Sequence, residues 1–176
     1  MSPTRGEGDE PVGPPSNGGT ITYVVTQVDV SDTLALRQAV LRPYLTIDEV
    51  GLPDDDDPST AAFAAVDAAG ELLSVARVTL EAAPFPTGDM DSDGSSEWRL
   101  RGMATQTEAR HRGLGSAVVR AIIAYVGAQG GGLLWCNARV PAVELYRRAG
   151  FTSYGEEWLD PDIGPHIVMW RLVAAA

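Results

Sequence analysis

Two residue types on which many sites depend are scarce in this chain of 176 residues, which has no lysine and only one cysteine, Cys136. The absence of lysine excludes the Walker loop, whose lysine reaches the phosphates of a nucleotide. One cysteine excludes an internal disulfide framework, and with only His111 and His166 beside it a Cys/His zinc site is excluded as well. We therefore expect no bound metal ion and a location in the reducing cytoplasm.

Long apolar runs are also missing. No stretch approaches the roughly 20 residues that cross a membrane, and the start lacks the basic-then-apolar pattern of a secretory signal. Hydrophobic residues still make up 44% of the chain, enough for one domain with a core. Residues 1–19 are rich in Pro, Gly and Ser, which predicts a disordered tail before a folded domain at 20–176.

Acidic residues predominate, but the charge is unevenly distributed. The net charge of −11 argues against a nucleic-acid partner. Residues 1–98 hold 18 acids and four arginines, whereas residues 99–148 hold eight arginines and two acids. Arginine suits a phosphorylated ligand because its planar fork matches phosphate oxygens, although a solvated helix face would look similar.

The spacing of apolar residues predicts a mixed α/β sheet in which strands and helices alternate. In the central strand, side chains should alternate, so that the odd-numbered residues from Glu97 to Thr105 share one face. The predicted strands are 20–28, 61–66, 72–80, 97–105, 133–136, 151–154 and 166–173, and the predicted helices follow Ser31, Gly113 and Pro141.

The clearest chemical motif is the turn Arg110-His111-Arg112-Gly113-Leu114-Gly115, between a predicted strand and a predicted helix. Backbone N–H groups at a helix start lack acceptors and carry the positive end of the helix dipole, and glycine lets an anion come close to them. A dinucleotide fingerprint would need glycine or alanine where Val118 stands. The remaining pattern, Arg-x-x-Gly-x-Gly, is typical of a phosphate site.

Together with Asn137 and the run from Leu145 to Phe151, this turn resembles the GNAT superfamily of acyl-CoA-dependent N-acetyltransferases. The family pattern of Gln or Arg, two residues, Gly, one residue, then Gly or Ala is met by Arg110, Gly113 and Gly115. The resemblance extends over about residues 20–173. It implies the GNAT fold, a central, mostly antiparallel sheet flanked by helices, in which two central strands splay apart.

The resemblance implies that acetyl-CoA is the cofactor. The backbone of residues 111–116 would hold its pyrophosphate, and Met103 and Thr105 would offer main-chain groups to the pantetheine arm and the thioester oxygen. For Met103 the alternative is plain core packing, and for Asn137 it is a turn or a helix cap. The implied cofactor-binding residues are Met103, Thr105, Arg110, His111, Arg112, Gly113, Leu114, Gly115, Ser116, Asn137 and Tyr146.

Acetyl transfer to an amine also needs an acid and a base. The amine must lose a proton before it attacks the thioester, and the departing thiolate benefits from a proton donor. Tyr146 matches the family's frequent general acid, and the alternative is a core tyrosine. Glu97 is the candidate base, acting through a water molecule, unless it only keeps the strand edge soluble. His166 is a second candidate base that could equally belong to a structural turn.

These features predict an acyltransferase that moves an acetyl group from acetyl-CoA to a small-molecule or peptide amine by direct attack in a ternary complex. The alternative is a catalytically weak GNAT module that senses acyl-CoA or docks a partner. The acidic loops at 54–57 and 89–93 could attract a cationic acceptor, or could simply maintain solubility. Dimers are common in the family, but the residues locate no interface.

Overall fold

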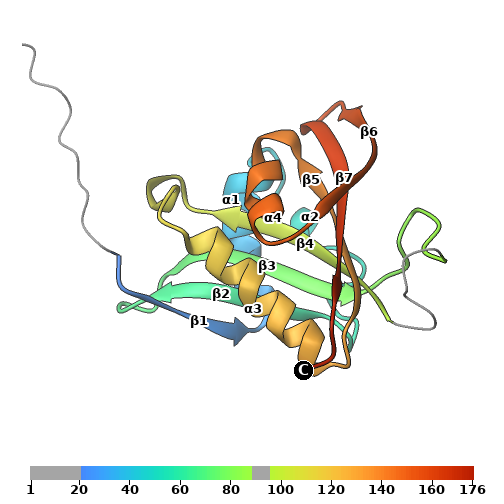
Figure 1. Ribbon diagram of the computed structural model, residues 1–176. Coiled ribbons are helices and arrows are strands. Elements are labelled where there is room, and N and C mark those ends of the chain that lie inside the picture. The colour runs from blue at the N-terminus through green and yellow to red at the C-terminus, as the bar shows by residue number, and fades with distance from the viewer. Residues whose placement is uncertain (1–20, 89–95) are drawn as a thin grey trace, which may run out of the picture.

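The computed structural model describes residues 21–88 and 96–176, which form a mixed sheet with helices on both faces (Figure 1). The predicted tail at 1–19 and the predicted acidic loop at 89–93 lie outside the described residues. The strands are β1 (Tyr23–Val28), β2 (Ala61–Asp67), β3 (Leu72–Leu80), β4 (Glu97–Thr105), β5 (Gly132–Arg139), β6 (Thr152–Asp160) and β7 (Gly164–Val173). The helices are α1 (Leu34–Leu41), α2 (Ile47–Val50), α3 (Leu114–Ala128) and α4 (Val143–Arg148), with short 3-10 turns at 30–33, 107–109 and 140–142.

The strands form one seven-stranded sheet in the order β1-β2-β3-β4-β5-β7-β6. Neighbouring strands are antiparallel except for β4 and β5, which are parallel. The predicted mixed α/β fold is therefore confirmed. The β5 and β6 strands extend beyond their predicted ends, because their additional residues pair with β7.

Helices cover the sheet from both sides. On one face α3 packs a stripe of apolar side chains, Leu114, Val118, Ile122 and Val126, into the main core. On the other face α1 lies against β3 and β4. Because both faces are covered, β2 and β3 are buried over almost their whole length and do not alternate between buried and exposed residues.

The two central strands separate soon after they meet. β4 and β5 pair only from Glu97 with Leu133 to Arg99 with Trp135, while β5 pairs with β7 over its whole length. Beyond Arg99, the edge of β4 that faces β5 has no strand partner among the described residues. The predicted splay is confirmed, and it opens a gap in the middle of the sheet.

A bulge at Gly102 interrupts β4. On β3, Val75 and Arg77 lie two residues apart, but their partners Ala104 and Arg101 lie three apart, so β4 carries one extra residue. Gly102 has a φ of +64°, which glycine adopts without strain. The bulge therefore needs glycine at this position.

This bulge makes the predicted common face of β4 wrong. Trp98 and Leu100 belong to the core on the α3 side, so the alternating Arg99 and Arg101 point to the opposite, α1 side. Without a bulge, the side chain of Met103 would lie on the same face of β4 as the two arginines. Instead it packs against the same core as Trp98 and Leu100. The extra residue has moved the end of the strand onto the other face.

Candidate active site

The turn before α3 has the backbone shape of an anion cradle. Gly113 caps the helix with a φ of +81°, and His111 also has a positive φ of 60°. The first helical hydrogen bond runs from the N–H of Ala117 to the oxygen of Gly113, at 3.0 Å. The N–H groups of residues 114–116 therefore have no acceptor within the helix, and they lie at the positive end of its dipole.

Gly115 leaves this cradle open. A Cβ atom there would lie 3.6 Å from Thr105 Oγ1 and 3.7 Å from Leu145 Cδ1, which are ordinary contacts. The surrounding protein would therefore accept a side chain, and the absence of one leaves the helix start accessible to a ligand. The exposed side chains of Arg110 and Arg112 flank the turn and add positive charge.

The end of β4 presents backbone groups to the gap. The N–H of Gln106 donates to Leu73 on β3 at 2.9 Å. Successive residues of a strand direct their backbone groups to opposite edges, so those of Thr105 face away from β3, toward the unpaired edge. Met103 lies two residues earlier along that same edge. A ligand in the gap could therefore bond to β4 as an additional strand would.

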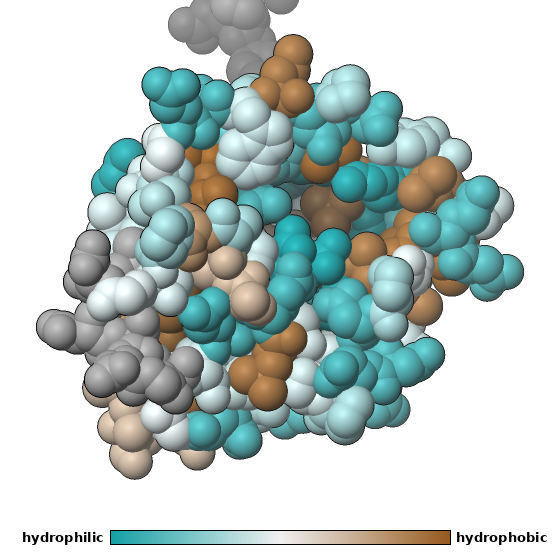
Figure 2. All heavy atoms as spheres, turned by 90° about the vertical axis from the view of Figure 1, so that its right-hand side faces the viewer, coloured by the Kyte–Doolittle hydropathy of each residue, from teal (hydrophilic) through white to brown (hydrophobic). Residues whose placement is uncertain are grey.

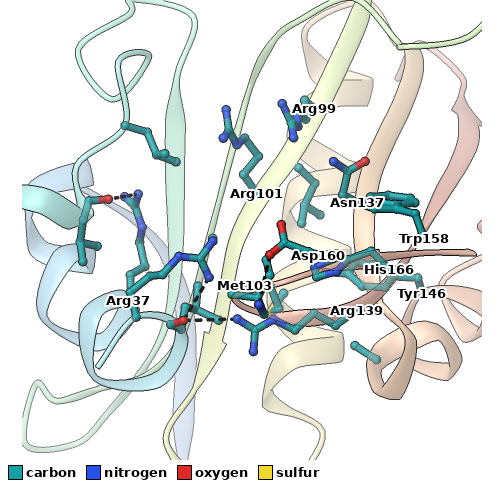
Figure 3. A pocket seen from close by; sticks show the side chains of 18 residues that line it. Arg37, Arg99, Arg101, Met103, Asn137, Arg139, Tyr146, Trp158, Asp160 and His166 are labelled. Atoms are coloured by element: carbon teal, nitrogen blue, oxygen red, sulfur yellow. Dashed lines mark hydrogen bonds between the residues drawn. The ribbon is translucent and has the colours of Figure 1, made fainter. Parts of the chain in front are cut away.

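A pocket of about 380 Å³ lies where β4 and β5 separate. Figure 2 shows a hollow bordered largely by hydrophilic side chains, with hydrophobic ones at its floor. Arg99 and Arg101 project from β4 on one side of the pocket, and Asn137, Trp158 and His166 lie on the other (Figure 3). The residues that line it are Arg37, Leu41, Arg42, Val50, Leu52, Arg99, Leu100, Arg101, Gly102, Met103, Asn137, Arg139, Ala142, Tyr146, Trp158, Asp160, Ile163 and His166.

Tyr146 reaches this pocket from α4. Only 4% of the residue is exposed, and its ring packs edge-on against Phe151 with 5.5 Å between centroids. Burial raises the pKa of the phenol well above its usual value, and nearby Cys136 raises it further. The hydroxyl has no hydrogen-bond partner among the described residues. A neutral, uncommitted phenol is therefore available to donate to a ligand.

His166 lies against the pocket from β7. Its Nδ1 atom is 2.7 Å from the carbonyl oxygen of Gly164, and the ring stacks on Trp158 at 5.6 Å. A carbonyl can only accept, so Nδ1 carries the hydrogen, and in the neutral ring Nε2 keeps a lone pair. His166 is thus fixed in the tautomer that a base at Nε2 requires.

Asn137 and Glu97 occupy contrasting positions. Asn137 is exposed, lines the pocket, and has no side-chain bond to the described residues. Glu97 does not line the pocket, and its carboxylate accepts from the Ala83 N–H at 2.5 Å and from Thr87 Oγ1 at 2.9 Å. The structure brings Asn137, Tyr146, Met103 and His166 together but leaves Glu97 outside this group.

The arginines of the pocket are the residues that the sequence pattern did not reveal as a site. Five of them line it, Arg37, Arg42, Arg99, Arg101 and Arg139, against a single carboxylate, that of Asp160. The alternating arginines of β4 were visible in the sequence, but only as part of the arginine-rich segment at 99–148. Their position in the pocket depends on the splay of the sheet, which brings their face of β4 to the cavity.

Comparison with known proteins identifies the fold. The Acetyltransferase (GNAT) family matches residues 33–151, more than half of the chain. The chain belongs to the GNAT acetyltransferase family. It is 31% identical over 147 residues to the uncharacterized N-acetyltransferase YitI of Bacillus subtilis strain 168. The alignment covers 84% of this chain and 94% of that protein.

Solved structures with low sequence identity share the same fold. A histone acetyltransferase HPA2 and related acetyltransferase from Corynebacterium glutamicum aligns with a TM-score of 0.65 at 21% identity, over 89% of this chain and 98% of that one. Arabidopsis thaliana NAA60, in complex with acetyl-CoA, aligns with a TM-score of 0.66 at 14% identity, over 86% of this chain and 99% of that one. This protein is thus a GNAT acyltransferase, a member of a family that uses acetyl-CoA.

The local structure of this GNAT domain fits that cofactor. The helix start with free N–H groups suits a pyrophosphate, and the unpaired edge of β4 suits the amide-bearing pantetheine arm. Within residues 21–88 and 96–176, no group of three or more His, Cys, Asp or Glu side chains could hold a metal ion. None of the helices in these ranges is long and apolar enough to cross a membrane.

Proposed function

We propose that this GNAT enzyme transfers the acetyl group of acetyl-CoA directly to a primary amine bound in the pocket, within one domain spanning residues 20–176. The observation that carries the proposal is the convergence of Met103 of β4, Asn137, Tyr146 and His166 around one cavity, where β4 has an unpaired edge. The cradle of α3 lies next to the end of the same strand, where a Cβ on Gly115 would be 3.6 Å from Thr105 Oγ1. Acetyl-CoA supplies an activated thioester, and the chain supplies binding, orientation and proton transfer.

Each group then has a role suited to its surroundings. Residues 111–116 bind the pyrophosphate through backbone N–H groups, and Arg110 and Arg112 add charge at the rim. The N–H groups on the free edge of β4, near Met103 and Thr105, stabilise the acetyl oxygen as it gains negative charge. Tyr146 donates a proton toward the departing sulfur. Its raised pKa keeps the phenol protonated at neutral pH.

For the proton on the amine, His166 is the better placed base. It lines the pocket and its Nε2 can accept, whereas Glu97 is committed to Ala83 and Thr87 and could act only through a chain of water molecules. Asn137 would hold the cofactor or an ordered water in this path. Its exposed amide can both donate and accept.

Direct attack is supported by the state of the one cysteine. Cys136 is buried in the main core on β5, and burial raises the pKa of its thiol far above the usual value. A neutral, buried thiol is a poor nucleophile, so no acetylated enzyme intermediate is expected. The intact mass of the protein after incubation with acetyl-CoA alone should show no acetyl adduct.

The test begins with calorimetric titration of the purified protein with acetyl-CoA and with CoA. We expect both to bind, and we expect free thiol and an acetylated product when an amine panel is added. If neither binds, the proposed cofactor site is wrong. If both bind but no amine in the panel is acetylated, the alternative role as an acyl-CoA-sensing module is favoured over transfer.

A further inference from the structure

The pocket has an excess of positive charge that the described residues do not neutralise. Behind its wall, Arg77 is 1% exposed and makes two hydrogen bonds to Asp54, at 2.8 and 2.9 Å. Arg37, 3% exposed, contacts Asp55 at 3.2 Å. Arg77 also meets Asp55, through its Nε at 2.9 Å. The loop at 54–57 is therefore turned partly inward, with two of its aspartates serving buried arginines.

Arg99 forms an ion pair with a third carboxylate, that of Glu81. Its Nη1 donates to Glu81 at 2.5 Å, and its guanidinium lies over the ring of Trp135, 4.5 Å from the centroid. The Trp135 indole N–H in turn donates to the backbone oxygen of Glu81 at 3.0 Å. The Nε atom of Arg99 is buried and has no hydrogen-bond partner among the described residues.

Arg101 is left without a carboxylate of its own. Its side chain is 26% exposed, and its nearest acidic oxygens lie at 3.5 Å on Asp54 and 3.6 Å on Glu81. That oxygen of Asp54 already accepts from Arg77, and the other oxygen of Glu81 accepts from Arg99. None of the five N–H donors of Arg101 makes a hydrogen bond to the described residues. Burial and the neighbouring Arg99 lower the pKa of this guanidinium, as expected for a cation with too little compensating charge.

The cluster thus contains four arginines, Arg37, Arg77, Arg99 and Arg101, and three carboxylates, those of Asp54, Asp55 and Glu81. Three of these arginines, Arg37, Arg99 and Arg101, line the cavity. Arg101 is the one that makes no hydrogen bond to the described residues, and it lies on the wall opposite His166 (Figure 3). A partly buried guanidinium with five unused donors matches a carboxylate or another planar or tetrahedral oxyanion.

We propose that the acceptor is a small amine that also carries an anionic group, and that Arg101, assisted by Arg99, binds this group. This inference rests on the proposed function, because it concerns the acceptor of that reaction. It disfavours the polycationic acceptors that the acidic composition suggested, since Asp54 and Asp55 serve buried arginines. The volume of about 380 Å³ suits a small molecule of amino-acid size.

The test uses matched pairs of amines that differ in the anionic group: L-alanine and L-alaninamide, L-methionine and L-methioninamide, and 2-aminoethylphosphonate and ethylamine, with spermidine as the polycation. Each is titrated calorimetrically into the CoA-loaded protein, and acetyl transfer is followed by thiol release. We expect at least one anionic member to bind and react more strongly than its neutral partner. The carboxylate and phosphonate arms show which anion is preferred.

The variant Arg101→Gln should weaken binding of the anionic member by about 30-fold or more, as when one partner of a hydrogen-bonded charge pair is removed, and leave its neutral partner unchanged. Arg101→Lys keeps the charge but lacks the planar guanidinium, so its affinity for the anionic member should lie between those of wild type and Arg101→Gln. Arg148→Gln, which removes the same charge from an exposed site on α4, is the control. Acetyl-CoA affinity should stay the same in all three variants.

The possible failures are distinguishable. If acetyl-CoA binds but every anionic member binds no better than its amide or amine partner, or if spermidine binds best, this inference is overturned and the proposed transfer stands. The same holds if Arg101→Gln leaves the preference intact. If the anionic members bind in an Arg101-dependent way but no acetyl group moves, the anion site is supported and the proposed transfer fails.

Discussion

At the scale of single residues, the phenol of Tyr146 can be tested with little effect on the fold. Tyr146→Phe removes an oxygen that has no hydrogen-bond partner among the described residues and keeps the ring on Phe151. If the phenol is the proton donor, kcat should fall by about 100-fold while the KM for acetyl-CoA changes little. Tyr125→Phe, in the core beside Phe63, is the matched control and should keep wild-type kcat. An unchanged kcat in Tyr146→Phe would exclude the acid role.

The base can be assigned by a second residue-scale comparison. His166→Asn places an amide near the position of Nδ1, which can keep the bond to Gly164, and removes the nitrogen that accepts the proton. We expect kcat/KM to fall and its pH profile to lose the limb that reports a titrating base. Glu97→Gln should preserve that limb, because its carboxylate holds the loop at Ala83. The reverse result would favour Glu97 as the base.

At the scale of elements, the start of α3 is the feature on which cofactor binding depends. Gly115→Asp places a negative charge near the positive end of the helix dipole, where it is favourable, and at a position where a side chain fits. The fold should therefore be at least as stable. The same charge would repel a pyrophosphate, and we expect acetyl-CoA affinity to fall about 100-fold or more by calorimetry. Gln129→Glu, at the opposite end of α3, adds the same charge and should leave affinity unchanged.

Most of the elements could be predicted from local patterns, although the short helix α2 was not. Apolar spacing after Gly113 and the glycines at 130–132 define α3, and the pairs of β-rich segments define the strands. The reversal of faces in β4 could not be predicted, because one left-handed residue, Gly102, breaks the alternation without changing the composition of the strand. For the site, the cradle is local and was predicted. The unused donors of Arg101 depend on Asp54 and Glu81, which only the tertiary fold brings near.

At the scale of the whole molecule, the charge distribution has a structural meaning that the net charge of −11 conceals. Carboxylates from the loops at 54–57 and after β3 fold back onto arginines of α1, β3 and β4. These interactions join the N-terminal half of the chain to the central strand and shape the wall of the pocket. The acidic loop is therefore part of the folded structure, and its contribution to stability should depend on pH.

Asp54→Asn tests this dependence. Burial raises the pKa of the Asp54 carboxyl, but the hydrogen bonds and charge of Arg77 outweigh it and hold the pKa below its usual value. A lowered pKa in the fold means that the stabilisation is complete above the unfolded pKa of about 3.9 and disappears as the pH falls through the folded value. At neutral pH we expect a loss of about 1.5–3 kcal/mol of unfolding free energy, since Arg77 stays buried with only Asp55.

Denaturant melts over a range of pH measure this effect. The difference in unfolding free energy between Asp54→Asn and wild type should close below about pH 4, where wild-type Asp54 begins to protonate. Asp56→Asn, which removes the same charge from an exposed neighbour, should show no such gap. A gap that persists unchanged to low pH would mean that packing, not the ion pair, accounts for the role of Asp54.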